Sequence, residues 1–324
     1  MRRKLLTSIL FALFAVVLGP SIGHAQEKFP SKPITVLVQF PPGGGTDITL
    51  RAIAGVIEKY LGQPLTIVNR PGGAGLVAGE TLVKAAPDGY TVAALVATGA
   101  DPGLFSHFRK AGYSLNDMEP IVRVSFDPYG LIVKADAPWK TLNEFIDHVK
   151  ANPKKVSWGH QGLGHSYHLR GMSLIQETGL EMNDVAFRGS AEEVVSVLGG
   201  KIDSAIVSIA ASRPFLEAGT LRMLALQHPT RLSYLPDVPT FAEQGHDVGF
   251  PLHYTGLFAP KGTPADRIKV IHDAVKNSFE DERFKEAMKK GGSDILYGSV
   301  ADLMQNVETM RRIYGGVFKK LGMQ

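Results

Sequence analysis

Short apolar runs alternate with longer stretches of helical periodicity along most of this chain. Each run spans three to eight residues rich in Val, Ile, Leu and Ala, and a turn or a helical pattern follows it. Such alternation is typical of α/β proteins in which helices cover parallel sheets. The predicted strands are residues 33–40, 65–68, 91–96, 131–133, 156–158, 185–187, 205–209 and 221–226.

Four helix starts are marked by residues that cap or open helices. Thr141, Ser190 and Thr240 are each followed three positions later by a glutamate, which is the spacing of a reciprocal capping box. Proline suits the first helical position, where its missing N–H loses no hydrogen bond, and Thr263 followed by Pro264 fits this rule. We therefore predict that helices begin at these four points.

Glycine-rich loops follow the first two predicted strands, at residues 41–47 and 69–75, and the first leads directly into a helix. The N–H groups of a first helical turn have no intrahelical partner, and the helix dipole adds positive potential. Glycine lets the backbone approach a ligand, and open α/β sheets bind ligands at the carboxyl ends of their strands. The loops predict a carboxylate or phosphate site, and the alternative for each loop is a plain tight turn.

Two nucleotide-binding motifs are excluded. A P-loop requires Lys-Ser or Lys-Thr after its glycines, and neither pair follows them here. A dinucleotide fingerprint requires an acidic residue at the end of the second strand, where this chain has Asn69 and Arg70. No pair of carboxylates stands out for acid–base chemistry, and Asp47 is explained by the helix dipole alone.

The segment 158–169 is the densest in reactive side chains. Ser166 stands within one residue of the nucleophile-elbow motif G-x-S-x-G, but His168 replaces the last glycine, where bulk hinders strand–helix packing. The favoured interpretation is a third glycine loop, with Gly162 and Gly164, that opens a helix at Ser166. The hydroxyl and imidazoles of this loop then serve as hydrogen-bond donors to an anion.

The same segment raises the hypothesis of a metal site, because it contains His160, His165 and His168. The last two are three residues apart, which places them on one helix face. The spacing differs from H-E-x-x-H, however, and no carboxylate lies nearby in the sequence. A metal site is therefore disfavoured.

A further helix N-terminus that favours an anion is expected at Ser190, because Arg188 and Gly189 directly precede it at the end of a predicted strand. A plain capped helix is the alternative. Asp203 is either a turn residue or a residue that orients a polar group of the site.

The first 25 residues fit a secretory signal peptide. Arg2, Arg3 and Lys4 precede an apolar run at 5–18 that is too short to span a membrane, and Ala25 ends the cleavage motif. Its removal leaves 32 basic and 31 acidic residues and lowers the net charge from +4 to +1, which does not support nucleic-acid binding. The absence of cysteine excludes disulfides, a thiol nucleophile and a lipoprotein anchor. We predict a free, monomeric periplasmic protein without a cofactor.

Two chain crossings, near residues 124–128 and 250–254, predict two lobes. The predicted organisation is a signal peptide at 1–25, a first lobe at 26–124 with a return segment at 250–324, and a second lobe at 125–249. The glycine loops then face each other across a cleft, and ligand pockets favour such domain interfaces.

In order and spacing, the motifs resemble those of the substrate-binding receptors of tripartite tricarboxylate transporters, also called Bug receptors. The resemblance covers essentially the whole mature chain, and the motifs are specific only in combination. They are P-S-K-P-I-T at 30–35, G-G-G-T-D at 43–47, L-G-Q-P at 61–64, N-R-P-G at 69–72, P-D-G-Y at 87–90, F-R-G at 187–189, G-G with Asp203 at 199–203, P-D-V-P-T with E-Q-G at 236–245 and A-P-K-G-T-P at 259–264.

The resemblance implies an α/β, type II-like periplasmic binding fold whose lobes close on a small carboxylate. The membrane permease subunits of a tripartite transporter would receive the ligand. A sensor kinase as partner and an exported hydrolase using Ser166 are the alternatives. The implied ligand-binding residues are Gly43, Gly44, Gly45, Thr46, Asp47, Gly162, Gly164, His165, Ser166, His168, Arg188, Gly189, Ser190 and Asp203.

The chain departs from the family pattern at positions that affect specificity. Pro41 and Pro42 replace small residues, His165 replaces a serine, and Ser196 replaces an aspartate. The last two changes favour an acid without an amino group. Phe40, Phe126 and Tyr254 are candidates for an apolar wall of the site, and the alternative for each is a place in the core.

Overall fold

The computed structural model of the chain describes residues 28–106, 110–246, 253–291 and 297–320. The predicted signal peptide and the first residues of the predicted return segment lie outside this part of the chain. Within the described ranges, no helix is both long enough and apolar enough to cross a membrane.

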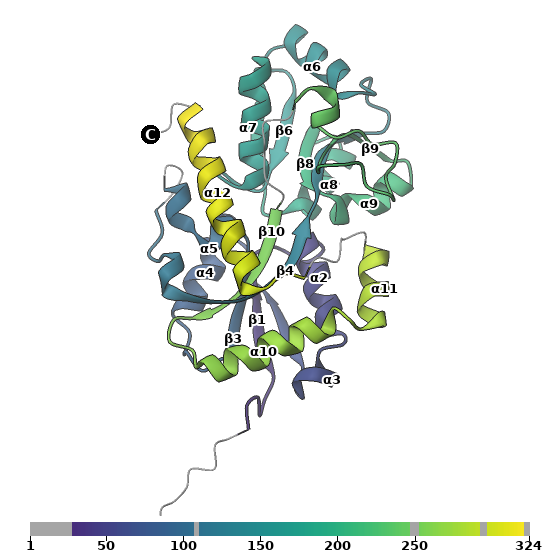
Figure 1. Cartoon of the computed structure of the whole chain (residues 1–324). Helices are drawn as coiled ribbons and strands as arrows, with labels where there is room; N and C mark the ends of the chain where they lie inside the picture. The colour runs from purple at the N-terminus through teal and green to yellow at the C-terminus, as the bar shows by residue number, and fades with distance from the viewer. Residues whose placement is uncertain (1–27, 107–109, 247–252, 292–296, 321–324) are drawn as a thin grey trace, which may run out of the picture.

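Two five-stranded sheets form two lobes (Figure 1). The first sheet, in the order β2-β1-β3-β10-β4, contains β1 (Ile34–Val38), β2 (Leu65–Asn69), β3 (Thr91–Leu95), β4 (Met118–Asp127) and β10 (His253–Pro260). The second sheet, in the order β7-β6-β8-β5-β9, contains β5 (Tyr129–Lys134), β6 (Ser157–His160), β7 (Asn183–Ala186), β8 (Ser204–Ser208) and β9 (Leu221–Gln227). The eight predicted strands all lie in these sheets, so the α/β, two-lobed prediction is confirmed.

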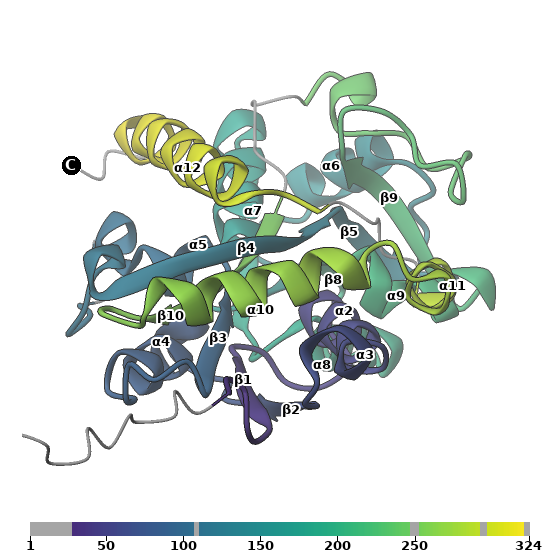
Figure 2. The ribbon, with the colours of Figure 1, turned by 60° about the horizontal axis from the view of Figure 1, so that its bottom comes forward.

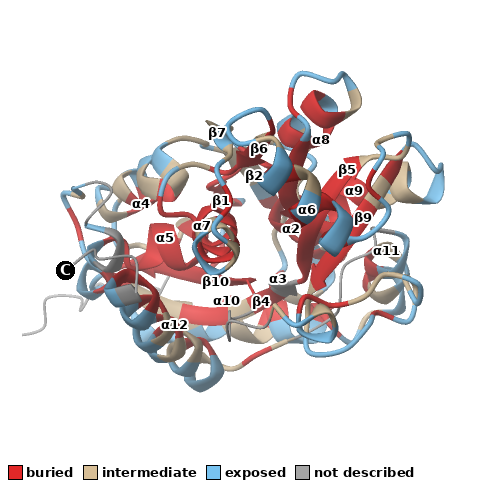
Figure 3. Cartoon of the chain, turned by 90° about the horizontal axis from the view of Figure 1, so that it is seen from above, coloured by how far each residue is buried: buried red, intermediate tan, exposed pale blue. Residues whose placement is uncertain are grey.

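Helices cover both faces of each sheet, and the central strands are buried between them, whereas the edge strand β7 is largely exposed (Figures 2 and 3). In the first lobe, one face carries α2 (Gly45–Ala54), α3 (Glu58–Leu61), α10 (Ala265–Ser278) and α11 (Glu282–Gly291), and the other carries α4 (Leu76–Val83), α5 (Ala97–Ala100) and α12 (Val300–Lys320). In the second lobe, α6 (Leu142–Ala151) and α7 (Ser166–Thr178) face α8 (Ser190–Leu198) and α9 (Ile209–Glu217) across the sheet. Short 3₁₀ turns lie at Gly73–Gly75, Pro102–Phe105, Leu115–Asp117 and Ala242–Gln244.

Apolar residues at helical spacing attach these helices to the sheets. In α6, Leu142, Phe145, Ile146 and Val149 form one stripe at i, i+3, i+4 and i+7, and all four are buried in the core of the second lobe. Burying each of these side chains stabilises the fold by about 1.5 to 3 kcal/mol.

The alternation of strands and helices implied parallel sheets, but both sheets are mixed. β10 is antiparallel to β3 and β4, and β5 is antiparallel to β8 and β9. The reason is that β4 leads into β5 through Pro128 alone, so the chain passes between the lobes without a crossover helix. β4 and β10 were expected only as crossing segments, since Pro120 and Arg123 interrupt the apolar pattern of β4.

The predicted helix starts have different outcomes. Thr240 and Glu243 form the reciprocal box, with N–H to side-chain oxygen distances of 2.7 and 3.0 Å. Thr141 accepts from the N–H of Glu144 at 3.2 Å. Ser190 is the first residue of α8 rather than its cap, and Pro264 precedes the first residue of α10. The Ser190 hydroxyl is used elsewhere, as the site shows.

Candidate functional site

The first glycine loop joins β1 to α2 and is held in place by Asp47. The carboxylate of Asp47 accepts from the Gly43 amide at 3.0 Å, from Arg51 Nε at 2.9 Å and from Asn69 Nδ2 at 2.9 Å. Although burial alone would raise it, the pKa of Asp47 is held below its usual value by these hydrogen bonds. Gly43 has φ of +89°, which favours glycine. Asp47 thus shapes the loop that presents the N-terminus of α2.

The loop between β6 and α7 is braced by two histidines. His160 Nδ1 accepts from the Gly162 amide at 3.2 Å, and His168 Nδ1 accepts from the Gly164 amide at 3.0 Å. Their Nε2 atoms point to Asp184 Oδ2, at 3.3 and 4.0 Å. Burial lowers the pKa of His160 more than its contact with Asp184 raises it, so the ring is neutral near pH 7.

These two histidines and Asp184 are close enough together to hold a metal ion, with ligand atoms within 4.8 Å of one another. The hydrogen bonds nevertheless oppose this use. An Nδ1 atom that accepts an amide N–H places the ring hydrogen on Nε2, which is then a donor to Asp184 rather than a metal ligand. The arrangement therefore fits a loop brace, and His165 of the original metal hypothesis is not part of it.

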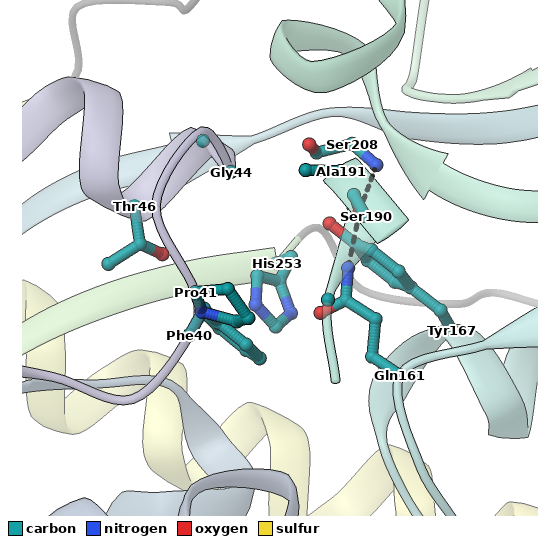
Figure 4. Close-up of a pocket in the computed structure, with 12 residues that line it drawn as sticks. Phe40, Pro41, Gly44, Thr46, Gln161, Tyr167, Ser190, Ala191, Ser208 and His253 are labelled. Atoms are coloured by element: carbon teal, nitrogen blue, oxygen red, sulfur yellow. Dashed lines mark hydrogen bonds between the residues drawn. The ribbon is translucent and has the colours of Figure 1, made fainter. Parts of the chain in front are cut away.

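Three helices of the two lobes direct their N-termini at one cleft between the lobes (Figure 4). Gly44 precedes α2, Gly189 precedes α8, and Ser208 precedes α9. Ser190 Oγ accepts from Gln161 Nε2 and from the Ser208 amide at 3.0 Å, which joins the lobe-two loops to one another. The partial positive ends of these helices favour an anion in the cleft.

The cleft combines these polar groups with an aromatic wall. It encloses about 350 Å³ of empty space, including its open mouth, and its walls carry no Lys, Arg, Asp or Glu within the described ranges. The lining residues are Phe40, Pro41, Gly44, Gly45, Thr46, Gln161, Tyr167, Gly189, Ser190, Ala191, Ser208 and His253. Burial lowers the pKa of His253 to about 3, so its imidazole is neutral near pH 7.

Glycines allow the loops of the two lobes to meet at the cleft. A Cβ atom on Gly189 would lie 2.9 Å from Cδ of Pro41, and one on Gly43 would lie 3.7 Å from Cβ of Ala191. A Cβ on Gly162 would lie 3.4 Å from Cβ of Ala74, in the second glycine loop. The two lobes are therefore in direct contact around the cleft.

The structure brings most of the expected site residues together. Five of them line the cleft, namely Gly44, Gly45, Thr46, Gly189 and Ser190. Those that support the surrounding loops without lining the cleft are Gly43, Asp47, Gly162, Gly164, His165, Ser166 and His168.

Two expected site residues are not brought to the cleft. Asp203 precedes β8, at the end of the strand opposite to Ser208, and its carboxylate accepts from the amide and hydroxyl of Ser157 at 2.8 and 2.6 Å. The Arg188 side chain is exposed and does not line the cleft. Of the expected apolar wall, Phe40 lines the cleft and Tyr254 is buried in the first-lobe core, while the Phe126 side chain is outside the described part.

Ser166 is not presented to the cleft as a nucleophile. It is fully buried, and its Oγ lies 3.0 Å from Nδ1 of His253. The low pKa of His253 makes it a weak base, and the cleft walls offer no carboxylate within the described ranges to orient it. This geometry does not support the exported-hydrolase alternative.

Four polar or aromatic cleft residues were missed by the sequence analysis: Gln161, Tyr167, Ser208 and His253. Gln161 and Ser208 stand at the carboxyl ends of predicted strands, so the strand-end rule that identified the first loop applies to them as well. Tyr167 follows the predicted helix start at Ser166. No local pattern identifies His253, because it reaches the cleft through the unpredicted strand β10.

Known proteins resemble this chain over nearly its whole length. The model of the family described as tripartite tricarboxylate transporter family receptor matches residues 49–323. The structure of the periplasmic binding protein BugD is 27% identical, with a TM-score of 0.85, and the match covers 91% of this chain and 99% of BugD.

Two similar structures from Rhodopseudomonas palustris contain dicarboxylates. MatC with bound malate is 27% identical, with a TM-score of 0.83, over 89% of this chain and 99% of MatC. A second protein, with adipate, is 28% identical, with a TM-score of 0.82, over 91% of this chain and 98% of that protein. The chain therefore belongs to the family of tripartite tricarboxylate transporter receptors, which are periplasmic solute-binding proteins.

Proposed function

We propose that this chain captures a small carboxylated organic acid in the cleft between its lobes and delivers it to the membrane subunits of a tripartite transporter. The observation that carries the proposal is the convergence of the N-termini of α2, α8 and α9 on a cleft whose described walls lack charged side chains. Backbone and hydroxyl donors bind a carboxylate there without a counter-ion.

The distribution of these donors over both lobes favours closure by hinge motion. α2 belongs to the first lobe, whereas α8 and α9 belong to the second, so an anion held by all three stabilises the closed arrangement. The hinge strands are β4 with β5 and the start of β10. The proposed organisation is a signal peptide at 1–25, a first lobe at 26–124 and 250–324, and a second lobe at 125–249.

The proposed ligand is a small acid, because helix N-termini from both lobes and uncharged polar side chains line the cleft together with aromatic rings. The dicarboxylates in the two R. palustris structures support this class. Phe40, Tyr167 and His253 supply ring surfaces for the carbon skeleton.

A thermal-shift screen of the protein from Gln26 against malate, adipate, citrate and benzoate tests the proposal. A ligand at 100 times its Kd stabilises the native state by about 2.7 kcal/mol, which raises Tm measurably. We expect one acid to raise Tm, to be recovered chemically unchanged, and to lose its effect in Ser190→Ala. Ser278→Ala is the matched control, since Ser278 is an equally buried serine that bonds to Ala274 O inside α10. No shift after refolding to remove carried-over ligand would contradict the proposal.

A further inference from the structure

Glu193 is a buried carboxyl group with no evident structural purpose. It stands in the first turns of α8, is fully buried, and neither of its oxygens forms a hydrogen bond within the part of the chain that the structure describes. The polar side chains that act on its carboxyl group are those of Gln161 and Ser190, which both line the cleft. The adjacent Glu192 behaves as an ordinary surface residue, exposed and accepting from the Arg188 amide at 3.1 Å.

The Ser190 hydroxyl connects Glu193 to the cleft. Ser190 Oγ accepts two N–H groups, from Gln161 and from the Ser208 amide, so both of its lone pairs are occupied. The Ser190 hydroxyl can therefore form a further hydrogen bond only by donating its own hydrogen. The acceptor is either an anion in the cleft or Glu193. An ionised Glu193 competes for this hydrogen, whereas a neutral Glu193 leaves it for the ligand.

The surroundings of Glu193 favour its neutral form. Burial raises the pKa of Glu193 well above its usual value, and the charge of Glu192 acts in the same direction, whereas Gln161 and Ser190 act against them. The polar groups that the β6 loop and β8 place around Ser190 are Gln161 and Ser208, which carry no charge. Within the described ranges, no cation compensates the carboxylate.

We infer that Glu193 is a specificity-determining residue: as a neutral acid behind Ser190, it lets the second lobe accept a carboxylate, and its ionisation weakens ligand binding. The inference rests on the proposed function, because it concerns the same cleft. A bound carboxylate adds a second negative charge close to Glu193 and so opposes its ionisation. At any pH at which Glu193 is partly ionised in the ligand-free protein, ligand binding is then accompanied by the uptake of protons.

Calorimetric titration between pH 5.5 and 9.5 tests the inference with the tightest binder among malate, adipate, citrate and benzoate. For the wild type we expect the affinity to be constant at low pH and to fall at high pH. The total fall is about tenfold for each unit by which the bound ligand raises the pKa of Glu193. Glu193→Gln keeps the shape of the side chain but cannot ionise, so its affinity stays constant. Glu192→Gln is the matched control on the same helix, and its affinity still falls at high pH, because Glu193 can still ionise.

Proton uptake provides a readout that requires no variant. At a pH within the falling part of the profile, the binding heat of the wild type differs between phosphate and Tris buffers in proportion to the protons taken up. Equal heats, or a wild-type affinity that is constant up to pH 9.5, overturn the inference while leaving carboxylate binding intact.

A measurement without ligand separates the two proposals. Because the pKa of Glu193 is raised in the folded state, its stabilising contribution is complete below the unfolded pKa and is lost as pH rises through the folded pKa. Glu193→Gln therefore loses less stability than the wild type between pH 6 and pH 9.5. Parallel stability profiles overturn the inference, whether or not an acid binds. Failure of every acid to bind, with stability profiles that differ as expected, contradicts only the proposed function.

Discussion

A methyl group added to Gly189 tests whether the lobes must meet at the cleft for ligand to bind. Gly189 has φ of 176°, an extended conformation that alanine also adopts, so Gly189→Ala creates no backbone strain of its own. The new Cβ, however, would lie 2.9 Å from Cδ and 3.5 Å from Cγ of Pro41 in the opposite lobe. The clash exists only when the lobes are together.

The expected effect follows from the cost of overpacking. Forcing an extra methyl into a well-packed contact costs about 1 to 3 kcal/mol. If the closed state binds the ligand, this cost appears in the affinity as an increase in Kd of about 5- to 150-fold. Titration calorimetry measures the Kd, and small-angle X-ray scattering measures whether ligand still reduces the radius of gyration.

Two further variants make the result specific. Pro41→Ala removes the Cδ and Cγ atoms that the new methyl would meet, so the Gly189→Ala, Pro41→Ala double variant recovers affinity relative to Gly189→Ala. Gly112→Ala is the control, because a Cβ there would have no neighbour within 4 Å among the residues that the structure describes. An unchanged Kd in Gly189→Ala would refute the argument that the contact between lobes is part of the binding state.

Three further predictions concern individual side chains. Asp47→Ala removes a buried carboxylate that accepts from Gly43, Arg51 and Asn69, and so lowers the free energy of unfolding by about 1.5 to 3 kcal/mol, together with ligand affinity. Asp302→Ala, at the exposed start of α12, costs about 1 kcal/mol or less and spares affinity. The wild type loses stability as pH falls from 6.5 toward 3, because the His253 imidazole stays neutral in the folded protein but takes up a proton in the unfolded chain. In chemical denaturation at several pH values, His253→Asn shows a flatter dependence of stability on pH. His165→Ser removes a buried ring that packs edge-on against Phe40, so the Kd ratio of bulky to small acids falls; an unchanged ratio would show that His165 has no part in selectivity.

The strands were predictable where an apolar run is uninterrupted and turn residues bound it. All eight such runs are strands, and for the central strands the reason is that burial between two helical layers requires a continuous apolar sequence. β4 and β10 escaped prediction because they link the lobes and carry polar or proline residues such as Pro120. The mixed direction of the sheets follows from these two strands and could not be derived without them.

The cleft was predictable where a local sequence pattern marks the loops that line it. Loops at the carboxyl ends of strands were found because glycine and a following helix mark them locally. Asp203 was misplaced because it lies at the amino end of β8, where it bonds to Ser157. The place of His253 in the cleft, and the hydrogen bonds of Ser190 with Gln161 and Ser208, depend on long-range contacts that no local pattern encodes. Glu193 looked like half of a capping box, but it is fully buried and Ser190 is the first residue of α8 rather than its cap.

Amide NMR of the ¹⁵N-labelled protein tests whether one carboxylate is held by helix N-termini of both lobes. On titration with the acid that raises Tm, we expect the amide resonances of Gly45 and Thr46 in the first lobe to shift together with those of Ser190 and Ala191 in the second. All four should report the same Kd. Shifts confined to one lobe, or found only at residues away from the cleft, would contradict the account.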